Sequence, residues 1–453
     1  MEFRNLTPFD ALCFSALDKQ DVEHPVIVMK VGYRLLPIAD RPGHFSAQVM
    51  DDEPLQLCTA DRYWGEEGQS SVCEESDLAP FKPRCDVIVN GHAHAPGAIP
   101  AQTWVAGIRL SIPLAPLVIK VARPKPWRPG EPLTEQQLYQ WRDALREAER
   151  RRATAPTRDV LLDKRLRFHG PRSFVHGLFS GWRLTEAEPA SCVPLRWEYA
   201  FGGASVLLNP RYPHEAAEPC LLNQVCYGNP LGRGWIEKRH EKLAWSLDAP
   251  IERLPAPQIE SADQPITHLD ITRQADGDIT SARMAELSAS YRYQPAGFGT
   301  LARMWAPRLA LAGTYDEAWQ AERWPGLPTD FDFGYWNGAP ADQQIAFAQP
   351  DLRIELFNLT DPALSHNGQV CVELPGHRPF VLMRLHNGVM LPLPLLTDTL
   401  LIDTDAMTVS VTHRISLPSC DPVRVLEARF ETDPAAPLLK RAPAPLQTRQ
   451  EAH

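Results

Sequence analysis

Apolar and polar residues alternate along much of the chain with a period of two, which is typical of half-buried β-strands. The clearest runs cover residues 25–35 and 104–112. In the first run every second residue from Ile27 to Leu35 is apolar, whereas Lys30 falls on the other face. Segments rich in Pro, Gly and Asp separate the runs, as antiparallel sheets require. The pattern predicts a mainly β protein of antiparallel, sandwich-like sheets joined by long Pro/Gly-rich loops.

Further alternating segments follow. Residues 117–121 continue the second run after a proline, and residues 164–169, 195–201 and 352–357 repeat the pattern. Near the end, residues 400–415 read as a hairpin that turns at the Asp-Thr-Asp sequence 403–405. We expect a strand at each of these positions.

One long segment follows helical spacing instead. Thr134 and Gln137 have the spacing of a capping box, which satisfies free backbone N–H groups at a helix start. Apolar residues then recur at helical intervals, namely Leu138, Trp141, Leu145 and Ala148. The sequence predicts an inserted helix near 133–152, and shorter helices at 281–290 and 316–323.

These patterns divide the chain into five segments. We expect an N-terminal β lobe (1–130), a helical insertion (131–158), a loop-rich core (159–345), a C-terminal β segment (346–430) and a mobile Ala/Pro-rich tail (431–453).

Composition narrows the possible functions. The 453 residues include 44 prolines, a density that disfavours helical bundles and solenoids. A net charge of −10 argues against nucleic-acid binding, which depends on clustered Lys and Arg. The amino terminus lacks a signal-peptide pattern, and no apolar run approaches the ~20 residues that span a bilayer. We therefore expect a cytoplasmic protein that is not inserted in a membrane.

Catalytic motifs are absent from the sequence. His92 and His94 could share a strand face, but no third metal ligand is evident, so neither a metal nor a cofactor is expected. Asp330 and Asp332 could project from one side of an extended segment. Together with Glu198 they leave open a hydrolase or carbohydrate-active enzyme that uses clustered carboxylates.

A series of loop motifs is more specific than any catalytic string. The motifs share Gly, Pro, aromatic, Asp and Arg residues and occur in order at 80–91, 195–203, 229–234, 295–299, 305–308, 313–319, 325–332 and 339–344. Together they resemble the family called domain of unknown function 2169, over residues from about 20 to about 420. The sequence departs from the family pattern at Pro171 and Phe174, where Asp and Trp are usual, and the predicted helix at 133–152 looks like an insertion.

The resemblance implies a function without catalysis. Members of that family are linked to type VI secretion systems, as cytoplasmic adaptor-chaperones. The implied role is to bind a toxic effector through a PAAR-type or amino-terminal region and to load it onto a VgrG-type spike protein. No catalytic residues and no cofactor come with the resemblance.

The family motifs supply the candidate site residues, which either bind a partner or hold loops in shape. They are Glu198, Tyr199, Phe201, Gly202, Gly203, Asn229, Pro230, Gly232, Gly234, Gly313, Thr314, Tyr315, Asp316, Trp319, Asp330 and Phe331. Exposed aromatic residues in rigid loops are typical of protein-binding hot spots. The inserted helix and the tail are alternative contact regions.

Overall fold

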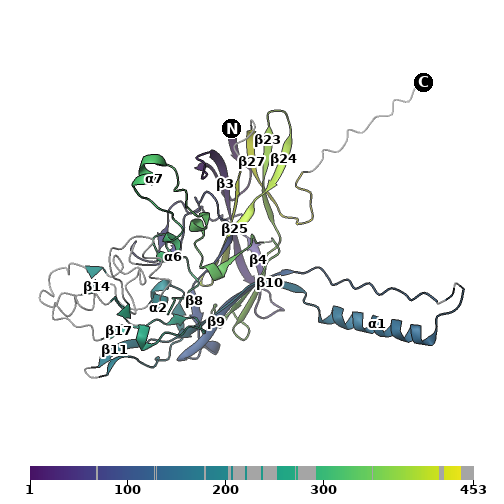
Figure 1. Ribbon diagram of the computed structural model, residues 1–453, viewed down its shortest axis with the longest axis horizontal. Coiled ribbons are helices and arrows are strands. Elements are labelled where there is room, and N and C mark those ends of the chain that lie inside the picture. Colours follow the sequence, from purple (N-terminus) through teal and green to yellow (C-terminus); the bar gives the residue numbers. More distant parts are fainter. Residues whose placement is uncertain are drawn as a thin grey trace.

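A computed structural model of the chain consists mainly of β-sheet, which confirms the predicted fold class (Figure 1). It describes residues 1–67, 70–126, 128, 130–177, 180–201, 253–270, 292–348, 350–417 and 423–439, and the residue pairs 206–207, 220–221, 236–237 and 272–273. The expected helix at 281–290 lies outside the described residues.

The largest sheet has twelve strands and combines segments from both ends of the chain. Strands from 1–130 and from 346–430 alternate in it, so these two ranges share one sheet. In spatial order the strands are β18 (Ile259–Glu260), β10 (Arg158–His169), β9 (Thr103–Pro113), β21 (Arg353–Phe357), β22 (Gln369–Glu373), β4 (His44–Val49), β3 (Glu23–Pro37), β26 (Thr408–Ser416), β25 (Leu396–Asp403), β7 (Cys85–Asn90) and β20 (Gln344–Ile345), and β2 (Asp10–Leu17) also pairs with β3. The expected strands at 164–169 and 352–357 and the 400–415 hairpin are present as β10, β21 and β25–β26.

A four-stranded sheet joins the two ends of the chain. Its order is β1 (Glu2–Asn5), β27 (Val423–Glu431), β23 (Arg378–Leu385) and β24 (Met390–Pro394). The smaller sheets pair β12 (Gly181–Leu184) and β17 (Arg253–Pro255) with β11 (Ser173–Gly177), β13 (Cys192–Pro194) with β8 (His92–His94), β5 (Arg62–Tyr63) with β6 (Val72–Glu74), β14 (Val206–Leu207) with β15 (Cys220–Leu221), and β16 (Ile236–Glu237) with β19 (Thr272–Arg273).

Helices are few and mostly short in the part of the chain that is described. The α-helices are α1 (Glu135–Thr154), α2 (Trp197–Phe201), α6 (Ala306–Leu309) and α7 (Glu317–Glu322), and the 3-10 helices are η1 (Pro96–Ala98), η2 (His268–Asp270), η3 (Phe333–Trp336) and η4 (Ala341–Gln343). The expected helices at 133–152 and 316–323 are present as α1 and α7. None of these helices has the length and apolar character needed to cross a bilayer.

The prediction that residues 195–201 form a strand is wrong, because α2 occupies most of that segment. Trp197, Glu198, Ala200 and Phe201 are all buried, a spacing that one helical turn produces and a strand does not. The expected strand at 117–121 is also not formed. Residues 114–126 are extended but belong to no sheet, and they run beside α1 instead.

Strand β3 is buried on both faces rather than one. Val28 and Lys30, on the predicted outer face, are as inaccessible as Ile27 and Met29 on the core face. The ammonium group of Lys30 is neutralised by Glu74 and by Asp77, whose Oδ2 lies 2.6 Å from Nζ. A lysine on a buried face requires such carboxylates, because an unpaired buried charge is very costly.

A second buried carboxylate connects the loops to the sheet. Asp86 of β7 is completely buried and accepts hydrogen bonds from Lys82 Nζ (2.8 Å), from the Asn337 amide (3.0 Å) and from the backbone N–H groups of Gly338 (2.9 Å) and Ala339 (3.1 Å). Burial alone lowers the pKa of Lys82, but the nearby carboxylates of Asp86, Asp398 and Glu75 outweigh it and raise the pKa. Loop 337–339 is thereby fixed against strand β7.

A buried histidine predicts how stability responds to acid. His413 of β26 is buried, its Nδ1 lies 3.0 Å from Thr397 Oγ1, and burial lowers its pKa to about 3. In the unfolded chain its pKa has the usual value of about 6.5. As the pH falls, the histidine of the unfolded chain is therefore protonated before that of the folded protein. Folding stability is therefore fully retained above about pH 6.5 and is lost progressively as the pH falls toward about 3.

We expect acidification from pH 7.5 to pH 5.0 to lower the unfolding free energy by about 2 kcal/mol through His413. Denaturant unfolding of the wild type and of His413→Gln at both pH values measures this effect. The variant should lose less stability than the wild type on acidification. An equal loss in the two proteins would show that His413 is not responsible.

Candidate functional site

The three candidate residues in α2 hold the core together rather than face solvent. Glu198 is buried and accepts hydrogen bonds from the backbone N–H (2.8 Å) and the hydroxyl (2.5 Å) of Ser71. Phe201 is buried and packs edge-to-face on Trp305, and Tyr199 is half-buried. These contacts assign the three residues a role in loop packing.

Six other candidates cannot be placed. Gly202, Gly203, Asn229, Pro230, Gly232 and Gly234 lie outside the described residues.

The remaining seven candidates come together in one loop, residues 313–331, which we call the α7 platform. Gly313 has a φ of 79°, and a Cβ there would lie 2.8 Å from Pro328 Cβ, so only glycine fits. Asp330 accepts hydrogen bonds from the backbone N–H (3.0 Å) and the hydroxyl (2.8 Å) of Thr314. These bonds lower the pKa of Asp330 and close the loop.

Aromatic side chains lie within helix α7 and on both sides of it in this loop. Asp316 accepts a hydrogen bond from Trp319 N (2.8 Å), which caps the helix start. The Trp319 indole donates to Gly326 O (2.9 Å) and packs edge-to-face on Tyr315 at 4.7 Å. Tyr315 is 55% exposed and Trp324 is 67% exposed, so both rings are available to a partner.

The inner side of the α7 platform is attached to the body of the protein. Phe331 is buried and packs edge-to-face on Phe333 and Tyr335. On the other side, the Arg323 guanidinium contacts Asp21 Oδ2 (2.8 Å) in the turn between β2 and β3. The platform therefore offers exposed aromatic rings on a rigid support, the arrangement that protein-binding hot spots favour.

The carboxylates considered for an enzyme each have a separate structural partner. Glu198 binds Ser71, Asp330 binds Thr314, and Asp332 Oδ1 accepts from Gly334 N (2.7 Å) at the start of η3. A general acid needs a raised pKa, whereas the pKa of Asp330 is lowered. Among the described residues, no group of three or more His, Cys, Asp and Glu side chains could hold a metal ion.

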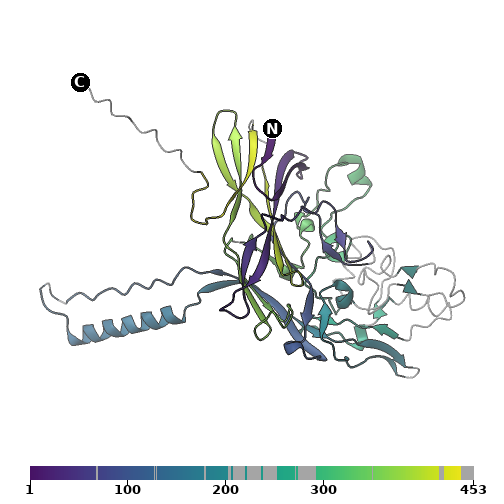
Figure 2. The same cartoon turned by 180° about the vertical axis from the view of Figure 1, so that it is seen from behind.

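A second prominent surface is the arm, which we define as residues 114–157. It leaves the large sheet after β9 and returns at β10, where Arg158 pairs with Pro113. The extended segment 114–126 and helix α1 run side by side away from the body, on the side opposite α7 (Figures 1 and 2). Of the helix residues only Ala148 is buried. The arm therefore contributes almost nothing to the core.

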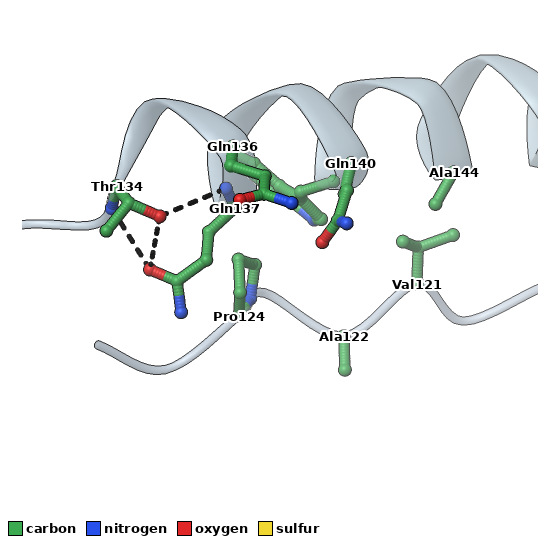
Figure 3. Close-up of a pocket in the computed structure, with 9 residues that line it drawn as sticks. Val121, Ala122, Pro124, Thr134, Gln136, Gln137, Gln140 and Ala144 are labelled. Atoms are coloured by element: carbon green, nitrogen blue, oxygen red, sulfur yellow. Dashed lines mark hydrogen bonds between the residues drawn. The ribbon is translucent and has the colours of Figure 1, made fainter. Parts of the chain in front are cut away.

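The extended segment and helix α1 of the arm contact each other along their length. The capping box of Thr134 and Gln137 begins the helix, and Gln137 also donates to Lys125 O at 3.0 Å. The Arg152 guanidinium also donates to Ile119 O, and the Arg123 guanidinium lies 5.8 Å from the centre of the Trp141 ring. Figure 3 shows Val121 directed at Ala144 beside a cavity of about 510 Å³. The apolar stripe of the helix is thus only partly covered.

The arm differs from the body in charge. Residues 114–157 contain nine Lys and Arg and five Asp and Glu, a net charge of +4, whereas the other residues contain 37 basic and 51 acidic ones, a net charge of −14. Exposed apolar residues accompany the basic ones, since Val118 is 74% and Tyr139 71% exposed. Mixed basic and apolar surface that projects into solvent suits contact with another protein.

Sequence reasoning missed two features of these surfaces. Trp324 was not among the candidates, although a tryptophan within the sequence Trp324-Pro325-Gly326, next to a family motif, was a usable signal. The strand predicted at 117–121 rests on Leu117, Ile119 and Val121, which fall at every second position. Ile119 and Val121 are half-buried, and the segment contacts α1 rather than a sheet: Val121 is directed at Ala144 (Figure 3), and Arg152 donates to Ile119 O.

Comparison with known proteins identifies a sequence family for the chain. No curated protein and no solved structure matches it. The family described as "uncharacterized protein conserved in bacteria (DUF2169)" matches residues 20–138 and 144–414, a match interrupted only within α1. Since this match covers most of the 453 residues, the chain belongs to the DUF2169 family.

Proposed function

We propose that this protein is a non-catalytic adaptor that holds a type VI secretion effector and loads it onto a VgrG-type spike protein. The observation that carries the proposal is the arm. A helix of 20 residues that buries only Ala148 does not stabilise its own body, so its surface is best explained by contact with another protein. The family resemblance supplies the identity of the partners.

An adaptor must hold two partners at once, and the structure offers two separated surfaces. The α7 platform exposes Tyr315 and Trp324, whose rings suit an apolar, aggregation-prone region of an effector. The basic arm projects on the opposite side and suits the spike protein. We assign the effector, through its PAAR-type or amino-terminal region, to the platform and the spike protein to the arm.

The alternative function is a carboxylate-dependent hydrolase. It has no support from the carboxylates considered for it, because Glu198, Asp330 and Asp332 form no convergent pair.

Co-expression with a type VI secretion effector and a VgrG-type spike protein of the same bacterium tests the proposal. We expect complexes of defined stoichiometry on size exclusion, and a lower soluble yield of the effector when the adaptor is omitted. Folded protein that binds neither partner, together with an unchanged effector yield, would refute the adaptor function.

Removal of the arm tests whether it binds the spike protein while the body binds the effector. Leu114 N donates to Thr157 O at 2.8 Å, so replacing residues 115–156 with Asn-Gly joins β9 to β10 through a two-residue hairpin turn. The shortened protein should keep its melting temperature and its complex with the effector. It should no longer bind the spike protein in the same pull-down, whereas retained spike binding would contradict our assignment of the arm.

Substitutions on the α7 platform test the effector contact. Tyr315→Ala and Trp324→Ala remove exposed rings. Stability should fall by no more than about 1.5 kcal/mol, the value of one aromatic pair such as Tyr315–Trp319. Effector affinity should fall by about 30-fold, the size of a typical hot-spot loss of ~2 kcal/mol. Ile99→Ala is the control, because Ile99 is 70% exposed but lies outside the platform. Calorimetric titration measures the effector affinities of the wild type and of the three variants. Equal affinities would remove the platform from the interface.

A further inference from the structure

Strand β2 leaves one backbone edge without a partner. It runs over eight residues, Asp10–Leu17, and pairs along its whole length with β3 only. Among the described residues, no hydrogen bond reaches the outer backbone groups of residues 11–17. Alternate N–H and C=O groups of this strand therefore point outward, in the spacing that another extended chain can pair with.

Two other free edges, those of β24 and β10, carry features that prevent such pairing, whereas residues 11–17 of β2 carry none. The edge strand β24 contains Pro392 and Pro394, which lack N–H donors. The free part of β10 contains the charged residues Asp159, Asp163, Lys164 and Arg165. Residues 11–17 of β2 contain neither proline nor charge. Leu12 and Leu17 are 39% and 42% exposed beside this edge.

The free edge lies next to the α7 platform. The turn after β2 contacts the platform through Asp21 and Arg323, and Arg323 Nη2 also donates to Lys19 O at 3.1 Å. The Lys19 ammonium lies 5.9 Å from the centre of the Phe333 ring. In both overall views the dark purple hairpin of β2 lies beside α7 (Figures 1 and 2). A chain paired with β2 could continue onto the exposed rings of the platform.

We infer that the outer edge of β2 receives a strand from the effector, by β-augmentation. The inference rests on the proposed function and specifies how the effector is held. The chemistry of the edge defines the occupant: an extended, uncharged and proline-free segment of about six residues, the usual length of a strand. Backbone pairing provides the attachment, and Leu12 and Leu17, which lie on opposite faces of β2, contact side chains on the two faces of the effector strand.

The test uses the 453-residue chain and a type VI secretion effector of the same bacterium. Leu12→Lys and Leu17→Lys place a charge along the edge at exposed positions that tolerate it. Leu391→Lys on β24 is the matched control, with the same 39% exposure as Leu12 on an edge already interrupted by prolines. We expect at least tenfold weaker effector binding for the two β2 variants and no change for the control. Hydrogen exchange should show slower exchange of β2 amides in the wild-type complex.

The outcomes separate the inference from the proposed function. A wild-type complex that forms, with unchanged affinity in the β2 variants and unchanged β2 exchange, overturns the inference alone. A protein that dimerises by itself, and becomes monomeric on Leu12→Lys, shows that a second copy occupies the edge and also overturns it. Absence of any effector complex removes the proposed function and the inference with it.

Discussion

The structure depends on neutralising the charges that it buries. Asp86 is fully buried in strand β7, and its carboxylate accepts hydrogen bonds from a lysine and from the loop at 337–339. Arg414 is likewise buried, and it binds Asp398 and the backbone oxygens of Asp77 and Ala79. Removing one partner from such a group leaves an unpaired charge, which is far more costly than losing an ordinary surface bond. The loop segments at 77–79 and 337–339 are therefore held in fixed positions against the large sheet.

The elements that were predictable from the sequence are those in which local pattern and tertiary environment agree. The capping box at Thr134 defines the start of α1, and the alternation in β9 matches its buried residues from Trp104 to Leu110. Prediction failed where tertiary contacts override the local pattern. Lys30 reads as a solvent-facing residue, yet Glu74 and Asp77 approach it from distant parts of the chain. No local signal in β3 indicates those partners.

The candidate residues show the same division. Gly313 and Asp330 are 17 positions apart and belong to two different sequence motifs. The folded chain joins these motifs into one loop through the left-handed backbone of Gly313 and the hydrogen bond from Thr314 to Asp330. Neither motif by itself indicates this contact. The motif aromatic residues have mixed roles, since Phe331 is buried whereas Tyr315 is exposed. Residue type alone does not distinguish packing from recognition. That distinction depends on which side of the loop each ring occupies, and only the folded chain determines it.

The pairing of β1 with β27 has a consequence for biosynthesis. The first strand of the chain lies against a strand that ends at Glu431, and β3 likewise pairs with β26. Strands β1 and β3 therefore lack these two partners until residues 408–431 have been synthesised, although β3 can already pair with β2 and β4. Contacts of such long sequence separation slow folding and prolong the exposure of aggregation-prone segments. A protein proposed to protect another chain must therefore itself pass through a stage at which it needs protection.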